Sequence, residues 1–222
     1  MKLYGYWRSS SAWRVRIALH LKALPFEYAA VHLVRDGGEQ YAPAHRARNP
    51  MAQVPVLEWS EGGATRYLSQ SMAIIEYLDE THPEPPLVPR DAFARAQARM
   101  LAEHINAGIQ PLQNAAVQKH VGELMPEAGD AAYRWASHWV SRGLAGLEAA
   151  VKPLAGRYCL GDSVTLPDLF LVPQMYSARR FKLDLAPYPT LARIDAALGE
   201  HPAFIAAHAD RQPDAAPPQP TR

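Results

Sequence analysis

Near its N-terminus the chain reads WRSSSAWRVRIAL (Trp7–Leu19), directly after a stretch, KLYGYW, that is typical of a β-strand. Apolar residues recur in this segment at helical spacing with arginines between them, so the sequence predicts a strand followed by an amphipathic helix. One serine is enough to cap the start of a helix. Three in a row, flanked by arginines, raise the question of whether a ligand is bound or activated there: Ser9, Ser10 and Ser11.

Length and composition are those of an ordinary folded protein. The chain has 222 residues, a length that favours two small domains. Its residues are 48% hydrophobic and 20% charged, as in folded soluble proteins. A net charge of +1 gives no reason to expect nucleic acid or a membrane surface as a partner, and no apolar run is long enough to span a bilayer. The N-terminus lacks the apolar core of a secretion signal, and the single cysteine fits a reducing compartment. We therefore expect a cytoplasmic protein.

The first 82 residues, 1–82, predict a compact α/β domain. Strand and helix signals follow one another in the order strand, helix, strand, hairpin, helix. The segment DGGEQ, at 36–40, is rich in turn-forming residues and predicts a turn. Ser71 is the expected N-cap of the last helix of this domain. After the first helix, the predicted strands cover 26–34, 54–59 and 65–68, and the second helix covers 70–80.

Four prolines in THPEPPLVPRD predict a linker at residues 83–91, because this segment cannot continue a helix. Residues 92–211 are expected to form an all-helical domain, and the Pro-rich tail, 212–222, to be disordered or loosely held. One helix opens with a capping box in which Thr165 reaches Asp168. The helices expected in this domain cover 92–118, 131–151 and 165–178.

Three signals in the N-terminal domain indicate one binding site. The serines stand at a helix N-terminus, where free N–H groups and the helix dipole favour an anion. In NPMAQVPVL, a cis Val54–Pro55 bond would turn the backbone of Val54 outward, where it could pair with an extended peptide. Gln70 and Ser71 begin the next helix, a second anion site. Glutathione as its thiolate has a matching shape: a carboxylate, a peptide-like middle and a negative sulfur.

The segment SSSAWRVRIAL resembles the SSCxWRVRIAL signature of the zeta-class glutathione transferases, the maleylacetoacetate isomerase family. The likeness continues through DGGEQ, NPMAQVP, QSMAIIEYLDE, GIQPLQN, GDSVTLPDL and RFKLDLAPYPTL, and so covers essentially the whole chain. It implies the glutathione transferase fold: an α/β thioredoxin-like N-terminal domain plus an all-α C-terminal domain. It also implies glutathione as cofactor and a homodimer.

The resemblance also implies roles for individual residues. Ser9 matches the family's catalytic serine, which hydrogen-bonds the glutathione sulfur, and Arg180 matches an arginine implicated in holding the substrate's carboxylate. Ser10 and Ser11 lie in the same catalytic signature, and Ser11 replaces the family's usual cysteine, which leaves rate and substrate preference open. Arg8, beside the serines, is our candidate for a second anion clamp. Positions that match glutathione contacts are Gln40, Val54, Gln70, Ser71, Gln110 and Asn114.

Each signal also has an ordinary structural interpretation. Serines before a helix are more often caps than catalysts, and Arg180 can equally be a surface arginine. Cys159 is better interpreted as a buried thiol than as a nucleophile. The nine histidines show no HExxH motif or paired ligand spacing, so no metal is expected.

The activity implied by the resemblance is cis–trans isomerisation of maleylacetoacetate, a small dicarboxylate enone, to fumarylacetoacetate. A thiolate can add to the conjugated double bond, leave a single bond that rotates, and then depart. Two other activities stay open: isomerisation of maleylpyruvate, and a transferase that acts on small electrophiles such as α-halo acids. A non-catalytic glutathione-binding scaffold is the last alternative, and the presence of Ser9, Gln70 and Ser71 argues against it.

Overall fold

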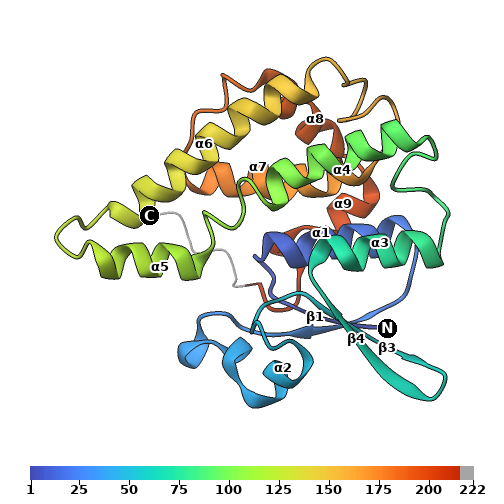
Figure 1. The fold of residues 1–222 in the computed structure, drawn as a ribbon, viewed down its shortest axis with the longest axis horizontal. Helices are drawn as coiled ribbons and strands as arrows, with labels where there is room; N and C mark the ends of the chain where they lie inside the picture. The colour runs from blue at the N-terminus through green and yellow to red at the C-terminus, as the bar shows by residue number, and fades with distance from the viewer. Residues whose placement is uncertain (216–222) are drawn as a thin grey trace. The chain divides into compact units, whose positions relative to one another are not determined.

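The structure is a computed structural model that describes residues 1–215. Contacts divide the chain into two units (Figure 1). The first comprises Met1–Pro85 together with the described residues from His201 onward, and the second comprises Pro86–Glu200. This division differs from the predicted one, because the predicted helical domain, 92–211, loses its last residues to the first unit.

Four strands form a mixed sheet in the first unit: β1 (Lys2–Gly5), β2 (Glu27–Ala30), β3 (Val56–Glu61) and β4 (Ala64–Ser69). Their order in the sheet is β2-β1-β3-β4. β1 and β2 are parallel, while β3 is antiparallel to both β1 and β4. The hairpin of β3 and β4 is the predicted one, and the glycine pair between them, at 62–63, supplies the positive φ angles of its turn. The sheet confirms the predicted thioredoxin-like domain.

Helices cover both faces of this sheet. α1 (Ser10–Leu21) and α3 (Ser71–Thr81) lie together on one face, and α2 (Pro43–Arg48) lies on the other (Figure 1). α9 (Pro202–Ala207) packs against α1 and was not predicted. The turn predicted at DGGEQ contains two 3-10 helices, η1 (Arg35–Gly37) and η2 (Glu39–Tyr41). β2 is shorter than the predicted strand over 26–34 because the chain leaves the sheet for this turn.

α1 is buried on all sides, so the prediction of an amphipathic helix was wrong. Every residue from Ala12 to Leu19 is buried, and neither Arg14 nor Arg16 has exposed surface. A charged group is buried only when it finds hydrogen-bond partners. Arg14 donates to the Ser71 hydroxyl at 3.2 Å, and Arg16 donates to three backbone carbonyls.

The second unit is all-helical, as predicted. α6 matches its predicted span, and α7 begins at the predicted capping box, in which both Thr165 and Asp168 take part. α8, rich in alanine and leucine, was not predicted. The helices of this unit are α4 (Ala92–Asn106), α5 (Ala115–Leu124), α6 (Ala131–Val151), α7 (Leu166–Arg180) and α8 (Pro189–Gly199).

The predicted single helix over 92–118 is wrong, because the structure has two helices there. α4 and α5 are separated by a turn over 107–114, in which Pro111 has no N–H for a helical hydrogen bond. Asn114 then starts α5 as its cap, since its Oδ1 accepts the backbone N–H of Ala116 at 2.9 Å.

The predicted tail is in part held against the first unit. The chain runs through η3 (Ala209–Arg211), and Asp214 accepts two hydrogen bonds from the first unit's N-terminal residues. The rest of the predicted tail, 216–222, lies outside the described residues. Within residues 1–215 no helix is long and apolar enough to cross a membrane, and no three His, Cys, Asp or Glu side chains are grouped to hold a metal ion.

Candidate active site

The sheet brings three of the predicted segments to one of its ends. Tyr4 of β1 pairs with Val56 of β3, and Val56 in turn pairs with Ser69 of β4. At this end the chain leaves β1 toward α1, enters β3 from Val54, and leaves β4 toward α3. The serine cluster, the Val54–Pro55 loop and the start of α3 are therefore neighbours, as the sequence predicts.

Ser9 is the N-cap of α1. Its Oγ accepts the backbone N–H of Ala12 at 3.2 Å, which uses an oxygen lone pair and leaves the hydroxyl proton for another acceptor. The first turn of α1 contains no acidic residue that would offset the positive end of the helix dipole. A half-buried hydroxyl with a proton to donate thus stands at a helix start that favours an anion.

The neighbours of Ser9 are partly exposed. Ser10 and Ser11 open the first turn of α1, and Arg8 precedes the cap. The guanidinium of Arg8 lies over the ring of Trp7, 5.4 Å from its centroid. This stacking holds a cation beside the start of α1.

Gln40 is buried in η2, and one atom of its amide lacks a partner. Nε2 donates to the Leu33 carbonyl at 3.4 Å, whereas the buried Oε1 accepts no hydrogen bond within residues 1–215. Gly38 makes room for this amide, because its φ is +110° and a Cβ there would lie 2.5 Å from Nε2 of Gln40. A buried amide oxygen without a partner is costly, and an N–H group of a ligand would satisfy it.

The Val54–Pro55 peptide bond is cis. The backbone of Val54 makes no backbone hydrogen bond within the described part of the chain. Its neighbour is fixed, because the Gln53 carbonyl accepts hydrogen bonds from His45 Nε2 and Asn49 Nδ2, both at 2.9 Å. The loop therefore presents a peptide group that an extended, peptide-like ligand can pair with.

Ser71 is not the cap of α3, contrary to the prediction. The N-cap is Gln70, whose side chain makes no capping hydrogen bond and whose φ of 72° and ψ of 117° are unusual for a residue with a side chain. Such a conformation costs on the order of 1–3 kcal/mol and is concentrated at functional sites. Ser71 is buried and accepts from Arg14, and the first turn of α3 has no acidic residue. With a buried cation behind it, this helix start suits a carboxylate.

The other predicted residues belong to the second unit. Gln110 is half-buried in the turn between α4 and α5, and Asn114 uses its Oδ1 as a cap, which leaves its amide N–H groups to donate. Arg180 is the last residue of α7 and is exposed. Their roles at the site stay predictions.

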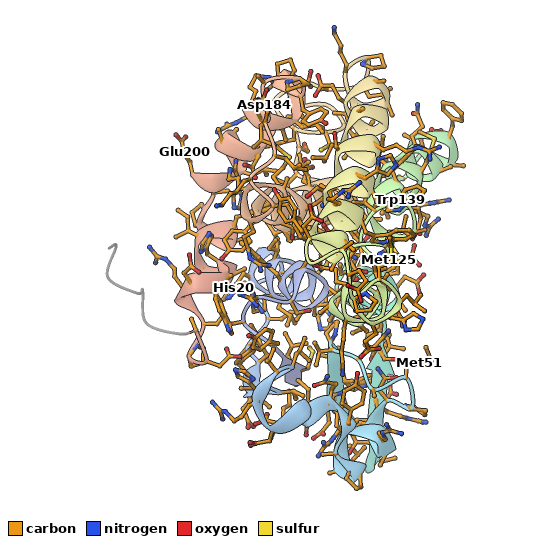
Figure 2. The ribbon with its side chains drawn as sticks, turned by 90° about the vertical axis from the view of Figure 1, so that its left-hand side faces the viewer. His20, Met51, Met125, Trp139, Asp184 and Glu200 are labelled. Carbon is orange, nitrogen blue, oxygen red and sulfur yellow. The ribbon has the colours of Figure 1, made fainter. Side chains whose placement is uncertain are left out.

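Sequence reasoning missed two kinds of residue near the site. One is the pair of buried arginines in α1, Arg14 and Arg16, whose signal was a charge inside an otherwise apolar helix. The other is Gln53, whose Oε1 accepts from Gln70 Nε2 at 3.5 Å. The loop that carries Gln53 lies at the surface, where Met51 is largely exposed (Figure 2). No local pattern marks Gln53, because its contacts depend on the fold.

A thioredoxin-like unit that offers two anion-favouring helix starts, together with an all-helical second unit, defines the class as glutathione transferases. In agreement, residues 3–86 match the family model described as "Glutathione S-transferase, N-terminal domain".

Known proteins with similar sequences narrow the class. "Probable maleylacetoacetate isomerase 2" of Drosophila melanogaster is 47% identical and covers 99% of this chain and 92% of its own. Maleylpyruvate isomerase of Ralstonia sp is 44% identical over 97% of this chain and 100% of its own. Two crystal structures of maleylacetoacetate isomerase from Anaeromyxobacter dehalogenans 2CP-1 are also similar. The one with glutathione bound is 56% identical and the one with dicarboxyethyl glutathione and citrate is 55% identical. Each has a TM-score of 0.88, and 97% of both chains is covered. The chain belongs to the maleylacetoacetate isomerase family, the zeta class of the glutathione transferases.

Proposed function

We propose that this protein is a glutathione-dependent cis–trans isomerase that converts maleylacetoacetate to fumarylacetoacetate. The observation that carries the proposal is the Ser9 hydroxyl, which caps α1 with its oxygen and keeps its proton for an anion. The names of the relatives support the substrate. The dicarboxyethyl glutathione in a relative's structure supports the reaction, because addition of a thiol to an unsaturated diacid leaves such a group on sulfur.

The residues of the first unit fit glutathione. The peptide group of Val54, which makes no backbone hydrogen bond within residues 1–215, suits its peptide-like middle. The start of α3, at Gln70 and Ser71, suits its γ-glutamyl carboxylate. The unpartnered Oε1 of Gln40 can accept an N–H group. In this placement the sulfur lies at the start of α1.

When bound, glutathione supplies a thiolate that adds reversibly to a conjugated double bond and so permits its rotation. Ser9 favours the ionised sulfur by donating its hydroxyl proton to it, and the dipole of α1 acts in the same direction. A hydrogen bond to a charged acceptor is worth roughly 1.5–3 kcal/mol. That energy lowers a thiol pKa by about one to two units from an ordinary value of about 8.5, which gives substantial thiolate at neutral pH.

Two arginines are proposed to hold the substrate's carboxylates. Arg8 offers a partly exposed guanidinium beside the serines, and Arg180 offers one at the end of α7. Gln110 and Asn114 of the second unit are proposed to donate amide hydrogen bonds to the bound glutathione. The two guanidinium groups, of Arg8 and Arg180, also favour the negative charge that develops on the substrate's carbonyl oxygen.

Maleylpyruvate isomerisation is the second candidate, because a maleylpyruvate isomerase is 44% identical over nearly the whole chain. Ser11 bears on this choice, since it places a hydroxyl where the family's signature has cysteine. We also propose that the protein is a homodimer, which the family resemblance supports. We propose a cytoplasmic location, which the free, buried thiol of Cys159 supports. Light scattering of the purified protein gives the oligomeric state.

The deciding experiment follows loss of the cis-enone absorbance of maleylacetoacetate, and separately of maleylpyruvate, with and without glutathione. We expect rapid loss of maleylacetoacetate only when glutathione is present. A Cys159→Ala variant serves as the control, because it removes the chain's single thiol and should leave the rate unchanged. Turnover of neither substrate, with glutathione still bound, would contradict the proposal and make α-halo acids the next substrates to test.

A further inference from the structure

The C-terminal residues of the first unit reach the turn that carries Ser9. Asp214 Oδ2 accepts the backbone N–H of Trp7 at 3.0 Å and the hydroxyl of Tyr28 at 3.3 Å. Trp7 lies two residues before Ser9, whereas Asp214 lies 207 residues from Trp7 along the chain. Burial raises the pKa of Tyr28, so its hydroxyl stays protonated and donates to the carboxylate.

Arg16 holds the same turn through its backbone carbonyls. Its Nη2 donates to the Trp7 carbonyl at 2.9 Å and its Nη1 to the Tyr6 carbonyl at 3.4 Å. Its Nε donates to the Ala207 carbonyl at 3.1 Å, which ties it to the C-terminal segment. Burial lowers the pKa of Arg16 to about 10, and the guanidinium therefore stays charged at neutral pH. The backbone N–H of Trp7 is thus held by the carboxylate of Asp214, and its C=O by the guanidinium of Arg16.

The hydrogen bonds of Asp214 and Arg16 to Tyr6 and Trp7 bear on the position of the Ser9 hydroxyl. The backbone N–H of Ser9 donates to the Tyr6 carbonyl at 2.9 Å, so the cap is attached to the turn that Arg16 and Asp214 hold. A shift of Tyr6 or Trp7 would move the Ser9 hydroxyl relative to anything bound in front of α1. Displacement of a catalytic group by about 1 Å can cost about 100-fold in rate.

We propose that Asp214 is a positioning residue for the reaction, because it fixes the turn before Ser9 and so aims the Ser9 hydroxyl at the glutathione sulfur. The inference rests on the proposed role of Ser9. It makes the position of the Ser9 hydroxyl depend on one carboxylate near the other end of the chain, that of Asp214.

The carboxylate of Asp214 is hydrogen-bonded through only one of its two oxygens. Its second oxygen, Oδ1, is buried and accepts no hydrogen bond within residues 1–215. Desolvation of such a half-paired charge offsets much of what its two hydrogen bonds contribute to folding. Removal of the carboxylate also takes away the acceptor of the Trp7 N–H and of the Tyr28 hydroxyl, and a negative charge near Arg16, so stability has to be measured together with turnover.

The test compares Asp214→Ala, Asp214→Asn and the control Asp210→Ala. Asn keeps an oxygen that can accept the Trp7 N–H, and Asp210 is an exposed carboxylate of the same segment whose Oδ2 lies 3.7 Å from His208 Nδ1. For each full-length variant we would measure isomerase turnover, the ultraviolet titration of the glutathione thiolate in the complex, glutathione affinity and thermal unfolding.

We expect Asp214→Ala to lower turnover at neutral pH by about tenfold, from misplacement of Ser9, and to move the thiolate titration to higher pH. Glutathione affinity should stay within about twofold, because none of its proposed contacts is removed. Asp214→Asn should regain most of the turnover, and Asp210→Ala should match the unmodified protein in all measurements.

Unchanged turnover and thiolate titration in Asp214→Ala would overturn the inference. So would a loss of turnover that follows a lower unfolding temperature while the titration stays in place, because that pattern is structural. If Asp214→Ala does not fold, Tyr28→Phe provides the test, since it keeps the ring, removes the 3.3 Å hydrogen bond to Asp214 and should shift the titration in the same direction. Absence of isomerase activity in the unmodified protein would contradict the proposed function instead, and the thiolate titration would still decide the role of Asp214.

Discussion

Replacement of Ser9 by alanine and by glycine should separate catalysis from helix capping. The Ser9 hydroxyl accepts the Ala12 N–H and, in the proposed function, donates to the glutathione sulfur. Loss of the cap costs about 1 kcal/mol with alanine but only a few tenths, roughly, with glycine. Both substitutions remove the same donated hydrogen bond, worth roughly 1.5–3 kcal/mol. The two variants should therefore differ in stability but lose the same amount of activity.

The expected loss of turnover at neutral pH is about tenfold to 100-fold, since each 1.36 kcal/mol corresponds to about a factor of ten. The same energy raises the pKa of the bound thiol by about one to two units. A raised thiol pKa means less thiolate at neutral pH, so both variants should regain turnover as the pH rises through the new pKa.

Initial rates across pH, with urea unfolding of the same samples, test this reasoning about Ser9. A glycine variant with unimpaired turnover at neutral pH would refute it. So would a loss that is large in Ser9→Ala and small in Ser9→Gly, because activity would then follow the stability of the α1 cap and not the hydrogen bond to sulfur.

The remaining predictions concern helix packing, thiol reactivity and glutathione binding. A Cβ at Gly143 of α6 would overlap the side chain of Ile109, so Gly143→Ala should destabilise the fold by about 1–3 kcal/mol in urea unfolding. Gly146→Ala, on the same helix with open space around it, should instead stabilise it by up to about 1 kcal/mol. Burial raises the pKa of the Cys159 thiol well above its usual range, so a thiol reagent should label it only in denaturant and should leave activity intact. Gly38→Ala should weaken glutathione binding in calorimetry, because it strains a φ of +110° and displaces the Gln40 amide; unchanged affinity would remove Gln40 from the site.

The features that the sequence predicts correctly have local causes. The periodicity of α6 sets its bounds, and Thr165 and Asp168 form the capping box within one helical turn. The β3–β4 hairpin follows from its glycine turn. The proximity of the serines, Val54 and Gln70 follows from their order along the chain, because neighbouring strands bring these segments to one end of the sheet, whereas their roles stay predictions.

The features that the sequence misses depend on contacts between distant segments. The break at 107–114 is the exception, because Gly108 and Pro111 are local residues that disfavour a helix and the single helix predicted over 92–118 did not take them into account. Ser71 was predicted to cap α3, but its hydroxyl accepts a hydrogen bond from Arg14, which belongs to another helix. Asp214 stands in a Pro-rich segment whose composition indicates a loose tail, and its partners are at the other end of the chain. Composition and periodicity contain no information about such pairs.

The Arg-Val-Arg order in α1 now has a physical explanation. Successive residues of a helix are rotated by about 100°, so residues two apart point about 200° from each other. Arg14 reaches the start of α3 through Ser71, while Arg16 reaches the turn before Ser9 and the C-terminal segment. One buried helix thus supports both anion-favouring ends of the site, one with each guanidinium. Lysine cannot fully replace Arg16, because its single ammonium group cannot span the carbonyls that Arg16 joins.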